Sequence, residues 1–239
     1  MEIRRFFIEP SNRQNDLVTI KGDEFVHLKK VLRLKAGFKI IVCFNDGYEH
    51  YCTLVTVADK YAVAKIDLSQ KTDDTLYDVT LFAGLLKGGK IDFVIQKCVE
   101  LGVKKIVPYI SKNTVEKNFN PDRANKISFE AAKQCGSSLI TEVTDAVTFD
   151  DVLRLSAGFK NKCFFYEDER ENSIEKFSLK QGDIAVVVGS EGGFTPEEVE
   201  SANLAGFNIL SLGKRVLRAE TACVVSSALI LYKLGAFGV

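Results

Sequence analysis

The chain falls into two regions in which hydrophobic positions recur with different spacing. Up to about residue 70, short apolar or alternating runs are separated by turn signals, which is the pattern of β-strands. The expected strands are 17–20, 39–44, 48–57 and 61–66. Asn45-Asp46-Gly47 predicts a hairpin turn between two of them, and a short helix capped by Asp23 is expected over 23–34. This region predicts a small β-barrel, followed by a polar linker over 69–75.

From Tyr77 onward, apolar strand-like runs alternate with helical patterns, which predicts an α/β region. The expected strands are 79–86, 105–110, 163–166 and 184–188, and the expected helices are 91–101, 121–135 and 221–234. Gly102 should end the first of these helices and Asn120 should cap the second. The last helix is almost uniformly apolar or small, so it must be buried in the core or against a second subunit. These patterns alone predict a doubly wound sheet without a knot.

Composition describes an ordinary globular protein and excludes several classes. The 239 residues are 46% hydrophobic and 27% charged, and no apolar run approaches the roughly 20 residues that span a bilayer. The first residues lack the features of an export signal. Six scattered cysteines without a C-x-x-C pair favour buried thiols in a reducing compartment, so we expect a cytoplasmic protein. With two histidines, neither a histidine-rich metal centre nor a Ser-His-Asp triad is expected.

Charge is balanced over the whole chain but uneven along it. There are 32 basic and 32 acidic residues. Residues 21–39 hold six basic side chains against two acidic ones, a local charge of +4. Such a patch is sufficient for contacts with nucleic-acid phosphates. A solvated helix face is the alternative interpretation.

Two glycine-bearing segments near the C-terminus predict a ligand site. They cover residues 189–198 and 212–222, and each follows a short apolar run and precedes a helical pattern. Each is therefore expected to leave the carboxyl end of a strand, where α/β sheets bind ligands. Because Leu212 lies only 23 positions after Gly189, we expect neighbouring strands and one shared pocket. Ordinary strand-to-helix connections are the alternative for either loop alone.

The first of these loops indicates which ligands are excluded. Thr195, Pro196 and Glu198 form the pattern of a helix start with a capping box. Glu191 lies inside the turn and no Lys-Ser/Thr pair follows, so this is not a phosphate loop, and the glycine spacing does not match a dinucleotide fingerprint. An acidic turn with free amides favours a ligand that has ring edges and a positive centre.

Both segments together resemble the SPOUT class of S-adenosylmethionine-dependent RNA methyltransferases. The most similar family methylates N3 of a uridine in small-subunit (16S) ribosomal RNA. Its signatures are matched by Gly189-Ser-Glu-Gly-Gly-Phe194 and by Leu212-Gly-Lys-Arg-Val-Leu-Arg-Ala-Glu-Thr221. The resemblance extends to Arg4-Arg-Phe-Phe7, His27, Val31-Leu-Arg-Leu34, Lys87-Gly-Gly-Lys-Ile-Asp92, Gln96-Lys97, Glu100-Leu-Gly-Val103 and Glu130-Ala-Ala-Lys-Gln134. The chain departs from the family at Ser190, at Ser137, at 138–141 and at Lys112-Asn113-Thr114.

The resemblance implies an α/β fold with two domains. Residues 1–72 would form a PUA-like RNA-binding β-barrel, and residues 73–239 a SPOUT domain with a C-terminal trefoil knot. The implied cofactor is S-adenosylmethionine, the implied partners are 16S ribosomal RNA and a second copy of the chain, and neither a metal nor a membrane is involved. Cofactor-binding residues would be Leu85, Gly189, Ser190, Glu191, Gly192, Gly193, Phe194, Leu212, Gly213, Val216, Leu217, Arg218, Thr221 and Ala222. RNA-binding residues would be Arg4, Arg5, Lys29, Lys30, Arg33 and Arg123.

Two side chains of the second loop are the candidates for chemistry. Uracil N3 carries a proton at neutral pH, so a site that methylates it must remove the proton or stabilise the anion. Arg218 is the candidate for holding the base or its anionic carbonyl, and Glu220 is the acidic residue of the motif able to accept a proton. Capping of the last helix is an equally good interpretation of Glu220. Methylation of another RNA position, a non-catalytic RNA-binding factor and a nucleotide-dependent oxidoreductase remain alternatives. The oxidoreductase lacks its fingerprint.

Overall fold

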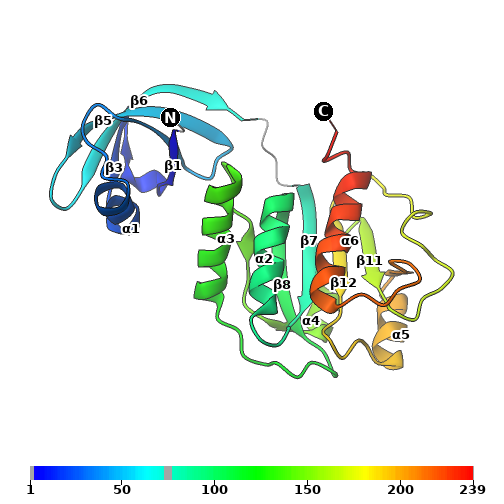
Figure 1. The fold of residues 1–239 in the computed structure, drawn as a ribbon. Helices are drawn as coiled ribbons and strands as arrows, with labels where there is room; N and C mark the ends of the chain where they lie inside the picture. Colours follow the sequence, from blue (N-terminus) through cyan, green and yellow to red (C-terminus); the bar gives the residue numbers. More distant parts are fainter. Residues whose placement is uncertain (1–2, 73–76, 239) are drawn as a thin grey trace. The chain divides into compact units, whose positions relative to one another are not determined.

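The computed structural model describes residues 3–72 and 77–238, which form two compact units (Figure 1). The first unit comprises Met1–Thr75 together with Ala132–Ile140, and the second comprises Leu76–Ala131 and Thr141–Val239. A linear division of the sequence does not anticipate that a later segment groups with the first unit. The expected domain boundary at 72/73 adjoins residues outside the described part and stays a prediction.

The first unit is built on a six-stranded, mainly antiparallel sheet. Its strands follow the order β1-β4-β5-β6-β3-β2, with β1 and β4 parallel and the other pairs antiparallel. Their bounds are Arg4–Phe7 (β1), Arg13–Gln14 (β2), Leu17–Ile20 (β3), Lys39–Cys43 (β4), Tyr48–Val57 (β5) and Ala62–Lys71 (β6). Three short helical segments accompany them: a 3-10 turn over Pro10–Asn12 (η1), α1 over Gly22–Val26, and a π-helix over His27–Val31 (η2).

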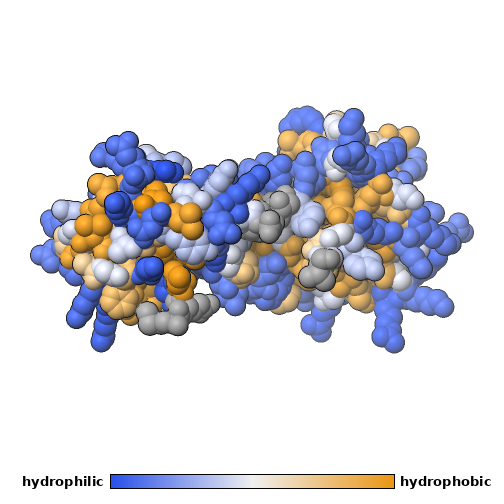
Figure 2. Space-filling view, turned by 90° about the horizontal axis from the view of Figure 1, so that it is seen from above, coloured by the Kyte–Doolittle hydropathy of each residue, from blue (hydrophilic) through white to orange (hydrophobic). Residues whose placement is uncertain are grey.

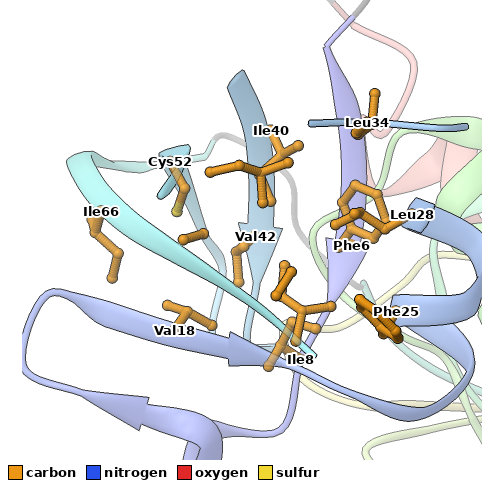
Figure 3. Close-up of a cluster of buried hydrophobic side chains, with 14 of the residues drawn as sticks. Phe6, Ile8, Val18, Phe25, Leu28, Leu34, Ile40, Val42, Cys52 and Ile66 are labelled. Atoms are coloured by element: carbon orange, nitrogen blue, oxygen red, sulfur yellow. The ribbon is translucent and has the colours of Figure 1, made fainter. Parts of the chain in front are cut away.

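Alternation along these strands encloses one hydrophobic core. Phe6, Val18 and Ile40 are fully buried, and Phe25 of α1 and Leu28 of the π-helix pack among them (Figure 3). Burying each such side chain stabilises the fold by about 1.5–3 kcal/mol. Because every second side chain of these strands points into this core, the sequence shows the period-2 pattern from which the sheet was predicted.

Several local expectations for this unit are confirmed and others are wrong. The hairpin turn forms, with left-handed backbone at Asn45 and Gly47. Asp23 is not a helix cap: the N-cap position falls on Lys21, without a side-chain cap, and the expected helix over 23–34 is split by the π-helix. The linker does not begin at Ser69, because β6 continues to Lys71; its residues 73–75 lie outside the described part.

The second unit has a seven-stranded, wholly parallel sheet. Its main path is β10-β8-β7-β12-β11-β13, and β9 pairs with β8. The strands are Tyr77–Gly84 (β7), Val103–Ile110 (β8), Glu142–Val143 (β9), Val147–Thr148 (β10), Asn161–Phe165 (β11), Ile184–Val188 (β12) and Asn208–Leu210 (β13). The helices are Lys90–Leu101 (α2), Pro121–Cys135 (α3), Phe149–Leu155 (α4), Pro196–Leu204 (α5) and Ala219–Lys233 (α6).

Helices cover both faces of this sheet (Figure 1). One face carries an aromatic cluster in which Phe149 of α4 and Phe194 pack on Phe82, Tyr109 and Phe164. On the other face α2 and α6 contact β7, β8 and β12 and each other. Since parallel sheets are buried on both sides, β12 is a continuous run of five buried residues.

The α/β fold class is confirmed, while the trefoil knot stays a prediction. Gly102 ends α2 in a left-handed conformation, and the Asn120 side chain accepts a hydrogen bond from Arg123 N at 2.9 Å at the start of α3. Five cysteines are buried, but Cys135 is exposed, so the expectation of six buried thiols is wrong at that position.

The described residues contain neither a membrane-spanning helix nor a cluster of metal-ligating side chains. On the face drawn in Figure 2, hydrophilic and hydrophobic residues are interspersed on both units. Within residues 3–72 and 77–238, no helix is long and apolar enough to cross a bilayer. The same residues contain no group of three or more histidine, cysteine and acidic side chains able to hold a metal ion.

Candidate active site

The loops after β12 and β13 line one cavity of about 290 Å³ in the second unit. Ten of the expected cofactor-binding residues contribute to its wall: Gly189, Ser190, Glu191, Gly193, Leu212, Gly213, Val216, Leu217, Arg218 and Ala222. Glu220 also lines it. The expectation of neighbouring strands is wrong, because β11 lies between β12 and β13. The shared cavity nevertheless forms, since the carboxyl ends of all three parallel strands meet at one edge of the sheet.

The first loop, residues 189–195, is packed closely against β7 and the aromatic cluster. A Cβ atom built at Gly84, the last residue of β7, would overlap Ser190 N and lie 2.8 Å from Gly189 C. A Cβ at Gly189 would lie 2.9 Å from the ring of Phe194. These close approaches, rather than turn geometry alone, require glycine. Phe194 itself does not face the cavity but packs in the aromatic cluster, 4.2 Å from Phe164 between ring centroids.

A turn after β8 braces the same loop from another direction. The Asn113 side chain donates to Gly192 O at 3.0 Å, and a Cβ at Gly192 would lie 2.5 Å from Asn113 O. Thr114 Oγ1 donates to Ser190 Oγ at 3.4 Å. The departures at 112–114 and at Ser190 are therefore in contact with each other. Both departures therefore bear on the first loop of the cavity.

Glu198 joins this brace to the start of α5. Thr195 and Glu198 form the expected capping box, with Pro196 in the first turn. One carboxylate oxygen of Glu198 accepts from Thr195 N and the other from Lys112 N, both at 2.9 Å. Glu198 is buried, so these charge-assisted hydrogen bonds satisfy a carboxylate that would otherwise be costly to bury.

The second loop, residues 211–218, is open by comparison. Residues 213–216 are exposed, and Val216 is 69% exposed. Ser211 Oγ accepts from Gly213 N at 3.2 Å. Gly213 adopts φ +114°, where a side chain is strained although no atom lies within 4 Å of its Cβ position. Glycine is required here because of this backbone conformation and not because of a close neighbour. The space beside Gly213 is open.

Charged side chains surround the mouth of the cavity. Glu191 Oε1 accepts from Lys90 Nζ at 2.9 Å and from Lys87 N at 3.2 Å. Burial opposes ionisation of Glu191, but these hydrogen bonds outweigh it and hold the pKa of the carboxyl below its ordinary value. The acidic turn expected from the sequence is thus partly compensated by a lysine.

The Glu220 carboxylate has an oxygen that accepts no hydrogen bond from the described residues. Its side chain is 15% exposed, and Oε2 is buried without a hydrogen-bond partner among the described residues. Lys90 Nζ lies 3.9 Å away. Glu220 lies in the first turn of α6, where its negative charge complements the helix dipole. The N-cap residue of this helix is Arg218, and its side chain makes no capping hydrogen bond. Arg218 is exposed at the cavity wall.

The remaining expected cofactor residues lie outside the cavity wall. Leu85 is buried, Gly192 faces Asn113, and Thr221 is exposed on α6. Lining residues that sequence reasoning missed are Lys90, Phe165, Tyr166, Glu167, Val188, Ser211, Arg215 and Ala219. Lys90 could have been found from the sequence, because it belongs to the Lys87-Gly-Gly-Lys90 segment that resembles the family. Tyr166 and Glu167 could not, because they follow β11, and the sequence did not predict that β11 lies between the two strands that carry the glycine loops.

The expected RNA-binding residues differ in their exposure to solvent. Arg5 forms an ion pair with Glu49, and its side chain is 17% exposed. Lys29 donates to Ala58 O at 2.7 Å and to Asp59 at 3.0 Å. Arg4, Lys30 and Arg33 are exposed, and Arg33 has left-handed backbone. In the second unit, Arg123 pairs with Asp92.

A larger groove of about 710 Å³ lies beside α5 and β13. Its wall includes Asp168, Glu169, Glu200 and Lys176 and none of the expected site residues. The smaller cavity is the better candidate, because both glycine loops and Glu220, whose Oε2 has no hydrogen-bond donor among the described residues, line it.

Comparisons with known proteins match two regions of the chain to RNA methyltransferase domains. An RNA methyltransferase domain matches residues 73–231, and an RNA methyltransferase PUA domain matches residues 20–67. "Ribosomal RNA small subunit methyltransferase E" of Bacillus subtilis is 31% identical over 249 aligned positions, covering 97% of each chain.

Solved structures extend the similarity to the fold. The protein of the same name from Neisseria gonorrhoeae, bound to S-adenosyl methionine, is 27% identical with a TM-score of 0.86, covering 96% of this chain and 97% of that one. A methyltransferase from Legionella pneumophila in complex with the same cofactor is 25% identical with a TM-score of 0.88, covering 97% and 98%. This chain therefore belongs to the RNA methyltransferase family that carries an N-terminal PUA domain.

Proposed function

We propose that this protein transfers the methyl group of S-adenosylmethionine to N3 of a uridine in 16S ribosomal RNA of the small subunit. The observation that carries the proposal is the cavity in which both glycine loops meet the Glu220 carboxylate, whose buried Oε2 has no hydrogen-bond donor among the described residues. A ribosomal RNA substrate would place the enzyme in the cytoplasm. The resemblance further supports a trefoil knot around the cavity.

The residues of the cavity fit the proposed cofactor. The cofactor is cationic at sulfur, and Glu191 and Glu220 place two carboxylates at the wall. Backbone groups of 189–193 and 212–217 would hold the adenine and ribose, and Leu212 and Leu217 would supply apolar contacts. Open space beside Gly213 allows close approach to its backbone. When bound, the cofactor supplies an electrophilic methyl group.

Glu220 is proposed to accept a proton from the uracil, and Arg218 to stabilise the negative charge that results. A carboxylate oxygen without a donor is able to accept the proton of N3, which makes N3 a nucleophile. The Arg218 guanidinium would stabilise the resulting negative charge on a uracil carbonyl, a contribution that depends on prior positioning. The target uridine must be unpaired or flipped out for N3 to be reached.

The first unit is proposed to bind RNA through its exposed cations. Lys30 and Arg33 are both exposed, whereas Lys29 is engaged with the 58–59 turn. Replacing Lys30 and Arg33 with alanine should weaken RNA binding and lower its salt dependence, while cofactor affinity stays unchanged. Lys65 and Lys71, exposed on β6, provide the matched control pair. A parallel loss of cofactor affinity would contradict the division of labour.

A homodimer is proposed from the faces of α2 and α6 that the chain leaves accessible. Phe93 is 47% exposed and Tyr232 is 69% exposed. Val224, Val225 and Leu229 of α6 are only half-buried. A closed two-fold pair is the commonest way to cover such a face. Light scattering should give about twice the 26.5 kDa chain mass, and a monomer at micromolar concentration would count against the pair.

The test is to incubate the protein with small-subunit particles that lack the modification and methyl-labelled cofactor, then map labelled nucleosides by mass spectrometry. The proposal expects 3-methyluridine at one position of 16S RNA. Label on another atom or RNA would support a related methyltransferase instead. Cofactor and RNA binding without any transfer would support a non-catalytic factor.

A further inference from the structure

Lys90 lies at the cavity wall between two carboxylates, those of Glu191 and Glu220. Its ammonium lies 2.9 Å from Glu191 on the loop after β12 and 3.9 Å from Glu220 on α6. These three side chains come from three different elements. Lys90 thus links the start of α2 to both halves of the site.

The local backbone explains how Lys90 reaches this position. Gly88 and Gly89 both have left-handed backbone, with φ +64° and +74°. The two residues turn the chain sharply after β7, and Gly89 is the N-cap of α2. Two successive left-handed residues are readily adopted only by glycine. The turn therefore fixes Lys90 as the first residue of a twelve-residue helix.

The two carboxylates are not equivalent in what else holds them. Glu191 has a second donor, the backbone N–H of Lys87 at 3.2 Å. Glu220 Oε2 has no hydrogen-bond donor among the described residues, and Lys90 is the cation that forms an ion pair with it. Removing Lys90 would therefore leave Glu191 attached and Glu220 without that counter-charge.

We propose that Lys90 is a positioning residue for methyl transfer, which holds the Glu220 carboxylate in its place at the cavity wall through their ion pair. The proposal rests on the proposed function, in which Glu220 accepts the N3 proton. Lys90 acts through Glu220 and does not itself touch the reacting atoms. Its hydrogen bond to Glu191 anchors the ammonium at the distance from which it serves Glu220.

The kinetic test uses four variants under saturating cofactor: Lys90→Met, Lys90→Arg, Glu220→Gln and the double variant Lys90→Met/Glu220→Gln. Single-turnover methylation should fall at least about tenfold in Lys90→Met, because misplaced catalytic groups cost this much or more. Lys90→Arg retains the charge and should recover most of the rate. The double variant should be no slower than Glu220→Gln alone, since residues that act as a unit are not additive.

Cofactor affinity provides the readout that separates positioning from a structural role. In Lys90→Met the dissociation constant should change less than about threefold, because Lys87 N still holds Glu191 and a single exposed ion pair contributes little. Lys104→Met is the matched control, since Lys104 pairs with Asp78 on the surface and should leave both rate and affinity unchanged. Additive losses in the double variant, or a loss confined to cofactor affinity, would overturn the proposal.

A titration of the Lys90 ammonium by NMR tests the same coupling without turnover. Its hydrogen bond to Glu191 is the main cause that raises the pKa of Lys90, and the charge of Glu220 raises it further. Glu191→Gln should therefore lower this pKa most, and Glu220→Gln should lower it by less. An unchanged titration in Glu220→Gln would overturn the proposal. If the wild-type protein binds cofactor but methylates no uridine, the proposed function fails, and this titration still decides whether Lys90 serves Glu220.

Discussion

The two loops of the cavity are built in opposite ways. Residues 189–195 are fixed by Gly84, by Phe194 in the aromatic cluster and by hydrogen bonds from Asn113 and to Glu198. Residues 213–216 are exposed, and within this loop Ser211 Oγ accepts from Gly213 N and donates to Gly213 O. The first loop is thus held against the folded core, whereas the second is largely exposed, and we expect it to gain contacts when a ligand binds. Substitutions at the first should cost stability, and substitutions at the second should cost binding or rate.

The largest expected effect is at Gly84, beneath the first loop. A Cβ there would overlap Ser190 N, so Gly84→Ala must push the loop outward. Overpacking of this kind costs about 1–3 kcal/mol of unfolding free energy, and cofactor affinity should fall at least about tenfold because the amides of 189–191 move. Denaturant unfolding and calorimetry measure both. Gly158→Ala, where no atom lies within 4 Å of the added Cβ, should be neutral in both assays.

The next effect is at Arg218, at the end of the second loop. A guanidinium forms a rigid fork that lysine does not reproduce. Arg218→Lys should keep the fold and the cofactor but lose at least about tenfold in single-turnover rate, equivalent to roughly 1.4 kcal/mol of transition-state stabilisation. Arg154→Lys, an exposed surface pair on α4, is the control. A wild-type rate for Arg218→Lys would reduce this arginine to a structural residue.

A smaller effect is expected at Asn113, which braces the first loop through a single hydrogen bond of 3.0 Å to Gly192 O. Asn113→Ala should weaken cofactor binding by about 1 kcal/mol, the net contribution of one such bond, or roughly fivefold in the dissociation constant. Calorimetry with Asn203→Ala, exposed on α5, as the control measures it. Unchanged affinity would mean that the other contacts of the loop hold it without this hydrogen bond.

The smallest effect on the fold is expected at Val216, on the second loop. Its side chain is 69% exposed, so Val216→Ala should change the free energy of unfolding by less than about 0.5 kcal/mol. The contrast with Gly84 is the informative result. A loss of stability as large as that of Gly84→Ala would show that the second loop is fixed as firmly as the first.

Local signals in the sequence predicted much of this architecture. The strand over Ile184–Val188, the end of α2 at Gly102 and the capping box at Thr195 depend on residues close in sequence, and all three are confirmed. Helix α4 was missed although Thr148 and Asp151 form a capping box at its start. Its seven residues are too few to show a clear helical period.

Features that depend on tertiary contacts escaped prediction. The order of β12, β11 and β13 and the approach of Gly84 to Ser190 join segments far apart in the chain. Gly192 was expected to bind the cofactor, which stays a prediction; the close approach of Asn113 to its Cβ position could not be predicted from the sequence. The sequence identified Glu220 as a candidate. Only the structure shows that its Oε2 has no hydrogen-bond donor among the described residues and that Lys90 lies 3.9 Å away.

Hydrogen exchange of the two loops, measured with and without S-adenosylmethionine, tests the account most directly. Amides of 189–195 should already be protected in the free protein, because their neighbours are packed or hydrogen-bonded. Amides of 212–217 should exchange rapidly in the free protein and become protected when the cofactor is added. Equal protection of both loops in the free protein, or no added protection at 212–217 with saturating cofactor, would contradict the account.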